Sequence, residues 1–252
     1  MVKKVLYRLP RIVHENETDR KIVLNRLRKY IVDDEEDFQY ERGRISKDEL
    51  KDPGRVKQGK DEFLVLPKKK YDSMNDLERK PQVISDKDAG TLIAKTCIDS
   101  DSHVLEAGSG SGFLTLHLGL TGADVDSYEK KKRHYSITKE NLEEYELDNV
   151  SLMNTDLEDA DLGTYSHIIL DLPNPERYLD NISETLELGG FLIIYSTNVN
   201  QVQEFYSAIE GFIHMETIEL IERGWKITED YARPHSNSVK HTGFLSIYRK
   251  SI

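Results

Sequence analysis

The sequence predicts an α/β fold, in which a doubly wound sheet with antiparallel terminal strands follows a small, mostly β N-terminal domain. Three observations predict it. Between residues 87 and 209, short apolar segments alternate with helical patterns, which is typical of a parallel sheet with helices on both faces. Beyond residue 209, apolar segments follow one another without helical patterns, which indicates antiparallel strands. Before residue 78, helical periodicity is weak, and glycine and proline punctuate the chain.

The expected elements follow in chain order, with an N-terminal domain of residues 1–78 and a second domain of residues 79–252. In the first domain, residues 63–66 are a predicted strand, residues 33–37 a solvated acidic loop, and residues 22–31 the segment with helical spacing. The expected helices of the second domain cover residues 89–98, 113–120, 131–145, 176–186 and 202–209. Its expected strands cover residues 104–107, 125–128, 150–153, 167–170 and 191–195, and then 212–221, 225–231 and 244–248.

Charge is distributed unevenly along the 252 residues, whose net charge is -11. Residues 1–80 carry 21 basic and 17 acidic side chains, whereas residues 81–252 carry 14 and 29. A basic first module favours a polyanionic partner, with plain surface solvation as the alternative. Cys97 is the only cysteine, which excludes a disulfide framework or a cysteine-based zinc site within one chain. No apolar run is long enough for a membrane span or a secretion signal, so we expect a cytoplasmic protein.

A glycine-rich turn joins a predicted strand to a predicted helix in Val104-Leu-Glu-Ala-Gly-Ser-Gly-Ser-Gly-Phe113. Glycines at such a turn let a ligand approach the backbone closely, and the helix start favours an anionic group. The dinucleotide-binding fingerprint requires glycine where this chain has Phe113, and a phosphate-binding P-loop requires Gly-Lys-Ser/Thr, which is absent. The turn therefore predicts a different kind of ligand site, and a bare tight turn is the alternative.

Acidic residues end three successive predicted strands: Glu106, Glu129 and Asp156. Ligands of open α/β sheets lie outside the carboxyl ends of the strands, so we expect these three carboxylates to converge on one cleft. A carboxylate after the second strand suits a pair of ribose hydroxyls, and one after the third suits an exocyclic adenine amine. Each acid singly fits a solvated loop, but three in register favour a ligand site.

These residues resemble the S-adenosylmethionine-dependent class I methyltransferases, whose first motif is an acid followed by Gly-x-Gly-x-Gly and whose seven-stranded sheet ends in an antiparallel hairpin. The resemblance implies S-adenosylmethionine as the cofactor, with its methionine part at the glycine turn, its ribose at Glu129 and its adenine at Asp156. Negative charge also suits a sulfonium cofactor. The cofactor-binding residues expected on this basis are Glu106, Gly108, Ser109, Gly110, Gly112, Glu129, Asp156 and Gln82.

Further segments narrow the resemblance. Asp171-Leu-Pro-Asn-Pro175 follows a predicted strand, Gln82-Val-Ile-Ser-Asp-Lys-Asp-Ala89 leads into a predicted helix, and Arg233-Pro234 precedes His241-Thr-Gly-Phe-Leu245 near the end. Together they resemble the tRNA adenine-N1 methyltransferases that modify position 58 of the T-loop, and in archaea also position 57. The resemblance covers residues 43–250, and His-Thr-Gly-Phe-Leu is its most specific part.

This resemblance implies a tRNA substrate and a homo-oligomer, a tetramer as in the family. Asp171 would be the catalytic residue, because its carboxylate would accept a hydrogen bond from the exocyclic amine of the target adenine and orient N1 toward the methyl group. The expected substrate contacts are Lys68, Lys69, Lys70, Arg233 and His241, with a solvated lysine run as the alternative for the first three. His235 and His241 lack clustered partners, so we expect no metal.

The chain departs from the family at two aromatic positions. Ser85-Asp86 stands where the family has Tyr-Pro, and Glu176 stands where it has tryptophan after the second proline. Because aromatic stacking contributes about 1–3 kcal/mol per base in single-strand binders, these departures concern the substrate more than the cofactor. Two alternatives stay open: a methyltransferase for a protein or small molecule, and a non-catalytic tRNA-binding subunit.

Overall fold

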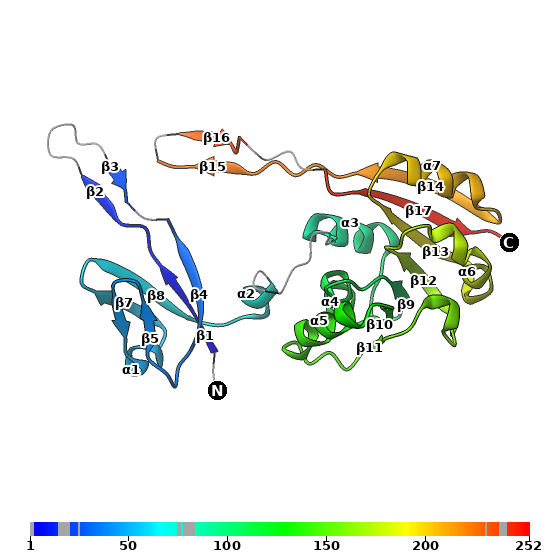
Figure 1. The fold of residues 1–252 in the computed structure, drawn as a ribbon. Helices are drawn as coiled ribbons and strands as arrows, with labels where there is room; N and C mark the ends of the chain where they lie inside the picture. The colour runs from blue at the N-terminus through cyan, green and yellow to red at the C-terminus, as the bar shows by residue number, and fades with distance from the viewer. Residues whose placement is uncertain are drawn as a thin grey trace. The chain divides into compact units, whose positions relative to one another are not determined.

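The computed structural model divides into two compact units, Met1–Leu77 and Glu78–Ile252 (Figure 1). It describes residues 3–14, 21–24, 26–74, 77, 84–229, 231–236 and 241–252. Within these residues, no helix is long and apolar enough to cross a membrane.

The N-terminal unit is built on a four-stranded antiparallel sheet in the order β4-β1-β8-β7. Its strands are β1 (Lys3–Arg8), β4 (Arg28–Asp33), β7 (Gly54–Gln58) and β8 (Asp61–Pro67). Two short ribbons pair β2 (Ile12–His14) with β3 (Lys21–Val23) and β5 (Phe38–Tyr40) with β6 (Gly43–Ile45), and the helices are α1 (Lys47–Leu50) and α2 (Lys70–Met74). The helical expectation for residues 22–31 is wrong, because this stretch supplies β3 and the start of β4, where Ile31 pairs with Val5.

A buried ion pair ties this unit together beneath its turns. The Arg8 guanidinium contacts the Asp61 carboxylate at 3.0 Å, and both side chains are 4% exposed. Its second terminal nitrogen donates to Glu41 at 3.0 Å. Arg8 on β1 therefore joins the turn between β5 and β6 to the turn between β7 and β8. The apolar core beside it consists of Leu6, Val32, Ile45, Leu50, Val56, Phe63 and Val65.

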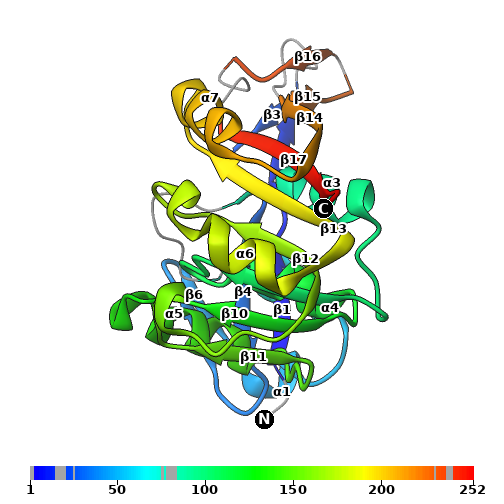
Figure 2. The ribbon, with the colours of Figure 1, turned by 90° about the vertical axis from the view of Figure 1, so that its right-hand side faces the viewer.

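The second unit contains a seven-stranded sheet in the order β11-β10-β9-β12-β13-β17-β14 (Figure 2). Its strands are β9 (His103–Ala107), β10 (Asp124–Tyr128), β11 (Val150–Met153), β12 (Tyr165–Leu170), β13 (Leu186–Ser196), β14 (Phe212–Glu219) and β17 (Phe244–Lys250). The first five in spatial order are parallel, and β17 lies antiparallel between β13 and β14. The predicted fold class is therefore confirmed, antiparallel terminal strands included.

Helices cover both faces of this sheet, because its central strands are apolar on both sides. Ile168 and Leu170 belong to one buried cluster, which includes Phe205 of α7, whereas Ile169 between them belongs to the other, which includes Leu92 of α3. The helices are α3 (Asp86–Thr96), α4 (Phe113–Leu120), α5 (Lys132–Glu143), α6 (Leu179–Thr185) and α7 (Val199–Ala208), with single 3₁₀ turns at Leu157–Asp159 and Pro175–Tyr178.

One predicted terminal strand lies outside the sheet. Residues 225–231 were expected to extend it, but β15 (Trp225–Ile227) pairs with β16 (Ala232–Pro234) in a separate ribbon. Both edges of β17 are occupied, by β13 and β14, so this segment cannot pair with the terminal strand that follows it in the chain. Trp225 and Ile227 remain 54% and 75% exposed on the ribbon.

The buried ion pair predicts a specific loss of stability. Asp61→Asn removes the buried carboxylate partner of the Arg8 guanidinium and leaves only exposed Glu41, and breaking a buried pair typically costs about 3–5 kcal/mol. We expect the amides of β1 and β8 to lose their protection from hydrogen exchange at a correspondingly lower urea concentration. Asp48→Asn is the matched control, because Asp48 and its partner Lys51 are both exposed. Equal shifts in the two variants would contradict the role of the pair.

Candidate functional site

A pocket of about 490 Å³ opens at the carboxyl ends of the parallel strands of the second unit. It lies where the strand order reverses, between β9 and β12, which is where ligands bind in open α/β sheets. Its volume suits a small organic ligand. The lining residues are Ala107, Gly108, Gly110, Tyr128, Glu129, Lys130, Lys131, His134, Thr155, Asp156, Leu157, Asp171, Leu172, Pro173, Tyr178, Tyr195, Thr197 and Gln201.

The glycine turn forms one wall because side chains would not fit there. A Cβ atom on Gly108 would lie 2.3 Å from the carbonyl oxygen of Asp171, and its φ of +95° is left-handed. A Cβ atom on Gly112 would lie 2.7 Å from a methyl group of Thr138 on α5. The turn therefore brings its backbone against the end of β12 and the middle of α5 and leaves backbone surface facing the pocket.

Glu129, directly after β10, is held at the pocket wall by backbone amides. One carboxylate oxygen accepts from the Gly110 amide at 3.1 Å, and the other accepts from the Lys131 amide at 2.8 Å. The His134 ring nitrogen lies 3.6 Å from the first oxygen. Since each carboxylate oxygen has two lone pairs, Glu129 keeps the capacity to accept two further hydrogen bonds.

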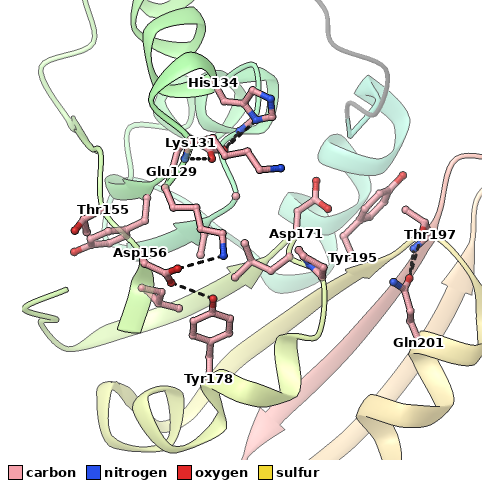
Figure 3. A pocket seen from close by; sticks show the side chains of 18 residues that line it. Glu129, Lys131, His134, Thr155, Asp156, Asp171, Tyr178, Tyr195, Thr197 and Gln201 are labelled. Atoms are coloured by element: carbon pink, nitrogen blue, oxygen red, sulfur yellow. Dashed lines mark hydrogen bonds and ion pairs between the residues drawn. The ribbon is translucent and has the colours of Figure 1, made fainter. Parts of the chain in front are cut away.

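Asp156, just beyond β11, is fixed by donors from two other elements. It accepts from the Tyr178 hydroxyl at 3.1 Å and from the Lys130 ammonium at 3.2 Å (Figure 3). Burial acts to raise the pKa of Asp156, but these two donors and the Glu158 amide outweigh it and hold the pKa below its usual range. Asp156 is therefore an ionised acceptor at neutral pH.

Asp171, the first residue after β12, has a carboxylate without a hydrogen-bond partner among the described residues. In Figure 3 it lies between Glu129 and Asp156 on one side and Tyr195 on the other. Its backbone amide donates to the Ala107 carbonyl at 3.0 Å, which fixes its position. Burial, followed by the nearby charges of Glu106 and Glu129, raises the pKa of Asp171 to about 7.

Glu106 does not line this pocket, so the expectation that three acids share one cleft is wrong for it. Side chains alternate along β9, and this alternation directs the Glu106 side chain under α4. There the hydroxyls of Thr115 and Ser127 both donate to the same Glu106 carboxylate oxygen, each at 2.6 Å. Glu106 is 1% exposed and borders a small cavity of about 20 Å³ that shares Gly108, Gly110 and Asp171 with the larger pocket. The Ser109 hydroxyl is buried there without a hydrogen-bond partner among the described residues.

The other residues singled out by sequence belong to other segments of the chain. Gln82 falls outside the described residues. Lys68, Lys69 and Lys70 belong to the N-terminal unit. The Arg233 guanidinium, on β16, lies 5.6 Å from the Tyr231 ring centroid. Neither Ser85 nor Glu176 lines the pocket; Ser85 donates to Asp88 at 2.8 Å at the start of α3.

The His-Thr-Gly-Phe-Leu segment is explained by its packing against the pocket rim. The His241 ring contacts Glu219 at 2.6 Å and the Thr197 carbonyl at 2.9 Å. The Thr197 bond, and then the Glu219 carboxylate, raise the pKa of His241, which favours the doubly protonated ring that can donate to both. A Cβ atom on Gly243 would lie 2.5 Å from the Tyr195 ring, so this glycine makes room for Tyr195.

Several lining residues escaped the sequence analysis. Tyr195 lies near the carboxyl end of β13. The rule that ligands lie outside the carboxyl ends of the strands, which we call the strand-end rule, selected the acids and could also have found Tyr195. Lys130 is an exposed side chain that binds Asp156 at the pocket edge. Tyr178 lies in a 3₁₀ turn, and nothing in the sequence pattern links it to Asp156.

A sheet of this strand order, with an acidic pocket at its carboxyl end, defines a class I methyltransferase. The chain belongs to the family described as the tRNA methyltransferase complex GCD14 subunit, whose model matches residues 72–241. Class I methyltransferases in general use S-adenosylmethionine, and tRNA is the substrate of this family. The resemblance predicted from the glycine turn and the C-terminal segment is therefore confirmed.

Individual relatives agree with this assignment. The tRNA (adenine(58)-N(1))-methyltransferase TrmI of Thermus thermophilus is 32% identical over 172 residues, covering 65% of this chain and 68% of that protein. The tRNA (adenine(57)-N(1)/adenine(58)-N(1))-methyltransferase TrmI of Methanocaldococcus jannaschii is 28% identical over 221 residues, covering 74% and 78%. The crystal structure of tRNA (m1A58) methyltransferase TrmI from Aquifex aeolicus matches with a TM-score of 0.79 and 25% identity, covering 99% of this chain and 97% of that one.

The burial of Glu106 predicts a pH-dependent stability. Burial is the main cause that raises its pKa from 4.5 to about 7. The folded chain therefore keeps a proton that the unfolded chain releases, so the free energy of unfolding falls as pH rises from about 4.5 to about 7. Glu106→Gln retains an acceptor for Thr115 and Ser127 but cannot ionise. Over this pH range, we expect the free energy of unfolding of Glu106→Gln to fall by about 3 kcal/mol less than that of the wild type.

Urea denaturation followed by circular dichroism between pH 4.5 and 8 checks this expectation. Asp101→Asn, on an exposed loop, is the control and should keep the wild-type pH slope. Parallel slopes for wild type and Glu106→Gln would show that Glu106 ionises normally in the folded chain.

Proposed function

We propose that this chain transfers the methyl group of S-adenosylmethionine to N1 of an adenine in the tRNA T-loop, at position 58, with position 57 as a second candidate. The observation that carries the proposal is the Asp171 carboxylate at the end of β12, which has no hydrogen-bond partner among the described residues and lies beside the two acids that follow β10 and β11. The named relatives that share the family support the same reaction.

The residues present fit the cofactor that the fold implies. The buried Ser109 hydroxyl without a partner and the left-handed backbone of Gly108, Gly110 and Gly112 suit the polar methionine part. Glu129 has acceptor capacity for two ribose hydroxyls, and Asp156 is an acceptor for the adenine amine. The proposed set is Glu106, Gly108, Ser109, Gly110, Gly112, Glu129, Asp156 and Gln82, with Glu106 acting from beneath the turn.

The bound cofactor supplies an electrophilic methyl group, whose transfer leaves the positive charge on the adenine ring. Asp171 accepts a hydrogen bond from the exocyclic amine of the target base, which aims the N1 lone pair at the methyl group. Its ionised carboxylate also stabilises the charge that develops on the ring. The target base has to leave the T-loop stack, which costs a few kcal/mol.

The proposed RNA contacts lie on both units. Lys68, Lys69 and Lys70 would neutralise phosphates from the N-terminal unit. Arg233 is exposed on the β15–β16 ribbon beside the Tyr231 ring, where its guanidinium would contact a phosphate or a base face. His241, fixed against Thr197, would add positive charge next to the pocket rim.

We also propose that the chain forms a homo-oligomer, a tetramer as in the family it resembles. Apolar side chains are exposed on the β15–β16 ribbon at Trp225 and Ile227, and on the edge strand β14 at Ile213 and Met215. Exposed apolar side chains on a sheet edge favour contact with a second copy of the chain. Analytical ultracentrifugation tests this, and a monomer at micromolar concentration would contradict it.

Methyl transfer to unmodified tRNA, followed by nucleoside digestion and mass spectrometry, tests the proposed function. N1-methyladenosine in the digest is the expected product. If the protein binds the cofactor but tRNA gains no methyl group, that result would overturn the proposed function in favour of another substrate or a non-catalytic subunit.

Asp171→Asn tests the catalytic assignment. The amide is neutral and should accept a weaker bond from the base, so we expect methyl transfer to fall about 10- to 100-fold while cofactor affinity stays within twofold. The wild-type rate should rise with pH up to about 7 as Asp171 ionises, and this rise should disappear in the variant. Asp101→Asn again serves as the control. Unchanged turnover in Asp171→Asn would contradict the catalytic role of Asp171.

A further inference from the structure

The N-terminal unit has a pocket of its own, of about 260 Å³. It is lined by Arg11, Tyr40 and Arg42 and by residues 58–61 of the turn between β7 and β8. It lies entirely within this unit and is separate from the acidic pocket of the second unit.

Two tight turns and one connecting segment present the cations of this pocket. Arg42 lies in the two-residue turn between β5 and β6, and Lys60 in the two-residue turn between β7 and β8. Gly59 permits the latter turn through its φ of +59°. The buried Arg8 guanidinium contacts Glu41 in the first turn and Asp61 at the second, each at 3.0 Å. Arg8 therefore sets the distance between the two turns and orients them as a pair.

The charge of the pocket is positive. Three cationic side chains line it, Arg11, Arg42 and Lys60, against one carboxylate, Asp61. That carboxylate is buried against Arg8 and lies 3.8 Å from Arg42, whose side chain is 57% exposed. Arg11 and Lys60 have no acidic partner in the part of the chain that the structure describes. A concave, cationic surface on a chain of net charge -11 is complementary to an anion.

We propose that Arg11, Arg42 and Lys60 bind a backbone phosphate of the RNA substrate, an inference that rests on the proposed function. Guanidinium groups bind phosphate oxygens through paired N–H donors, and an ammonium adds a point charge. Such contacts fix the register of the RNA on the protein without reading its sequence.

This site is distinct from the lysine run at residues 68–70. The run follows the end of β8 at Pro67, whereas Lys60 precedes its start at Asp61. A seven-residue strand spans about 20 Å, too far for one phosphate to touch both. The two cationic groups would therefore hold different phosphates along the RNA.

The test measures the affinity of unmodified tRNA by fluorescence anisotropy across a series of salt concentrations. In the double variant Arg42→Ala/Lys60→Ala, the slope of log K against log salt should fall in magnitude by about 1, because the site holds one phosphate. The KM for tRNA should rise about tenfold, with kcat and cofactor affinity unchanged, because the pocket does not touch the reacting atoms.

Two matched variants control for charge and for folding. Lys57→Ala removes an exposed lysine of β7 that does not line the pocket, so it should keep the wild-type slope. Arg42→Lys/Lys60→Arg keeps both charges and should restore most of the affinity. Circular dichroism of all variants should match that of the wild type.

Three outcomes separate this inference from the proposed function. A wild-type slope in Arg42→Ala/Lys60→Ala, or an equal loss in Lys57→Ala, would overturn the phosphate site even when wild-type protein produces N1-methyladenosine. A reduced slope confined to the double variant would support the site. Because binding is measured without turnover, that result holds even where no methylated nucleoside forms, which would count against the proposed reaction alone.

Discussion

The contact between Gly108 and the end of β12 is the constraint on which the site depends. A side chain at position 108 would overlap the Asp171 carbonyl, so the two central strands approach closely only because this residue is glycine. The Gly108 amide also donates to the Tyr128 carbonyl at the end of β10, at 2.9 Å. Three strand ends are thereby fixed relative to one another. Asp171 and Glu129 inherit their positions from this arrangement, which is why the acids meet at one pocket.

The electrostatics of the site favour a cationic ligand. Burial raises the pKa values of both Glu106 and Asp171 to about 7, and mutual repulsion with Glu129 adds to the effect. Carboxylates that share a low-dielectric site are destabilised when all are ionised, and a nearby positive charge relieves this repulsion. A sulfonium cofactor supplies such a charge, and so does the adenine ring after methylation. Lys130 donates to Asp156 and offsets part of its charge.

The sequence predicted the strands of the seven-stranded sheet, the helices that cover it and the glycine turn, because their periods and turn residues are local signals. The prediction failed where pairing with a distant segment decides which element a stretch of the chain forms. Residues 22–31 have helical spacing but pair with β1, and residues 225–231 resemble a sheet strand but form a ribbon with β16. The strand-end rule located Glu106 at the correct edge but not on the correct face, because the rule ignores the alternation of side chains along β9. Tyr178 is brought to Asp156 by a 3₁₀ turn that no periodic pattern marks.

Titration calorimetry of S-adenosylmethionine tests most directly whether the contact at Gly108 builds the cofactor site. We expect one cofactor per wild-type chain and about 10- to 100-fold weaker binding for Gly108→Ala, because the added methyl group pushes β9 and β12 apart. Gly54→Ala is the control, since nothing lies within 4 Å of a Cβ atom there. Wild-type affinity in a folded Gly108→Ala would contradict this origin of the site.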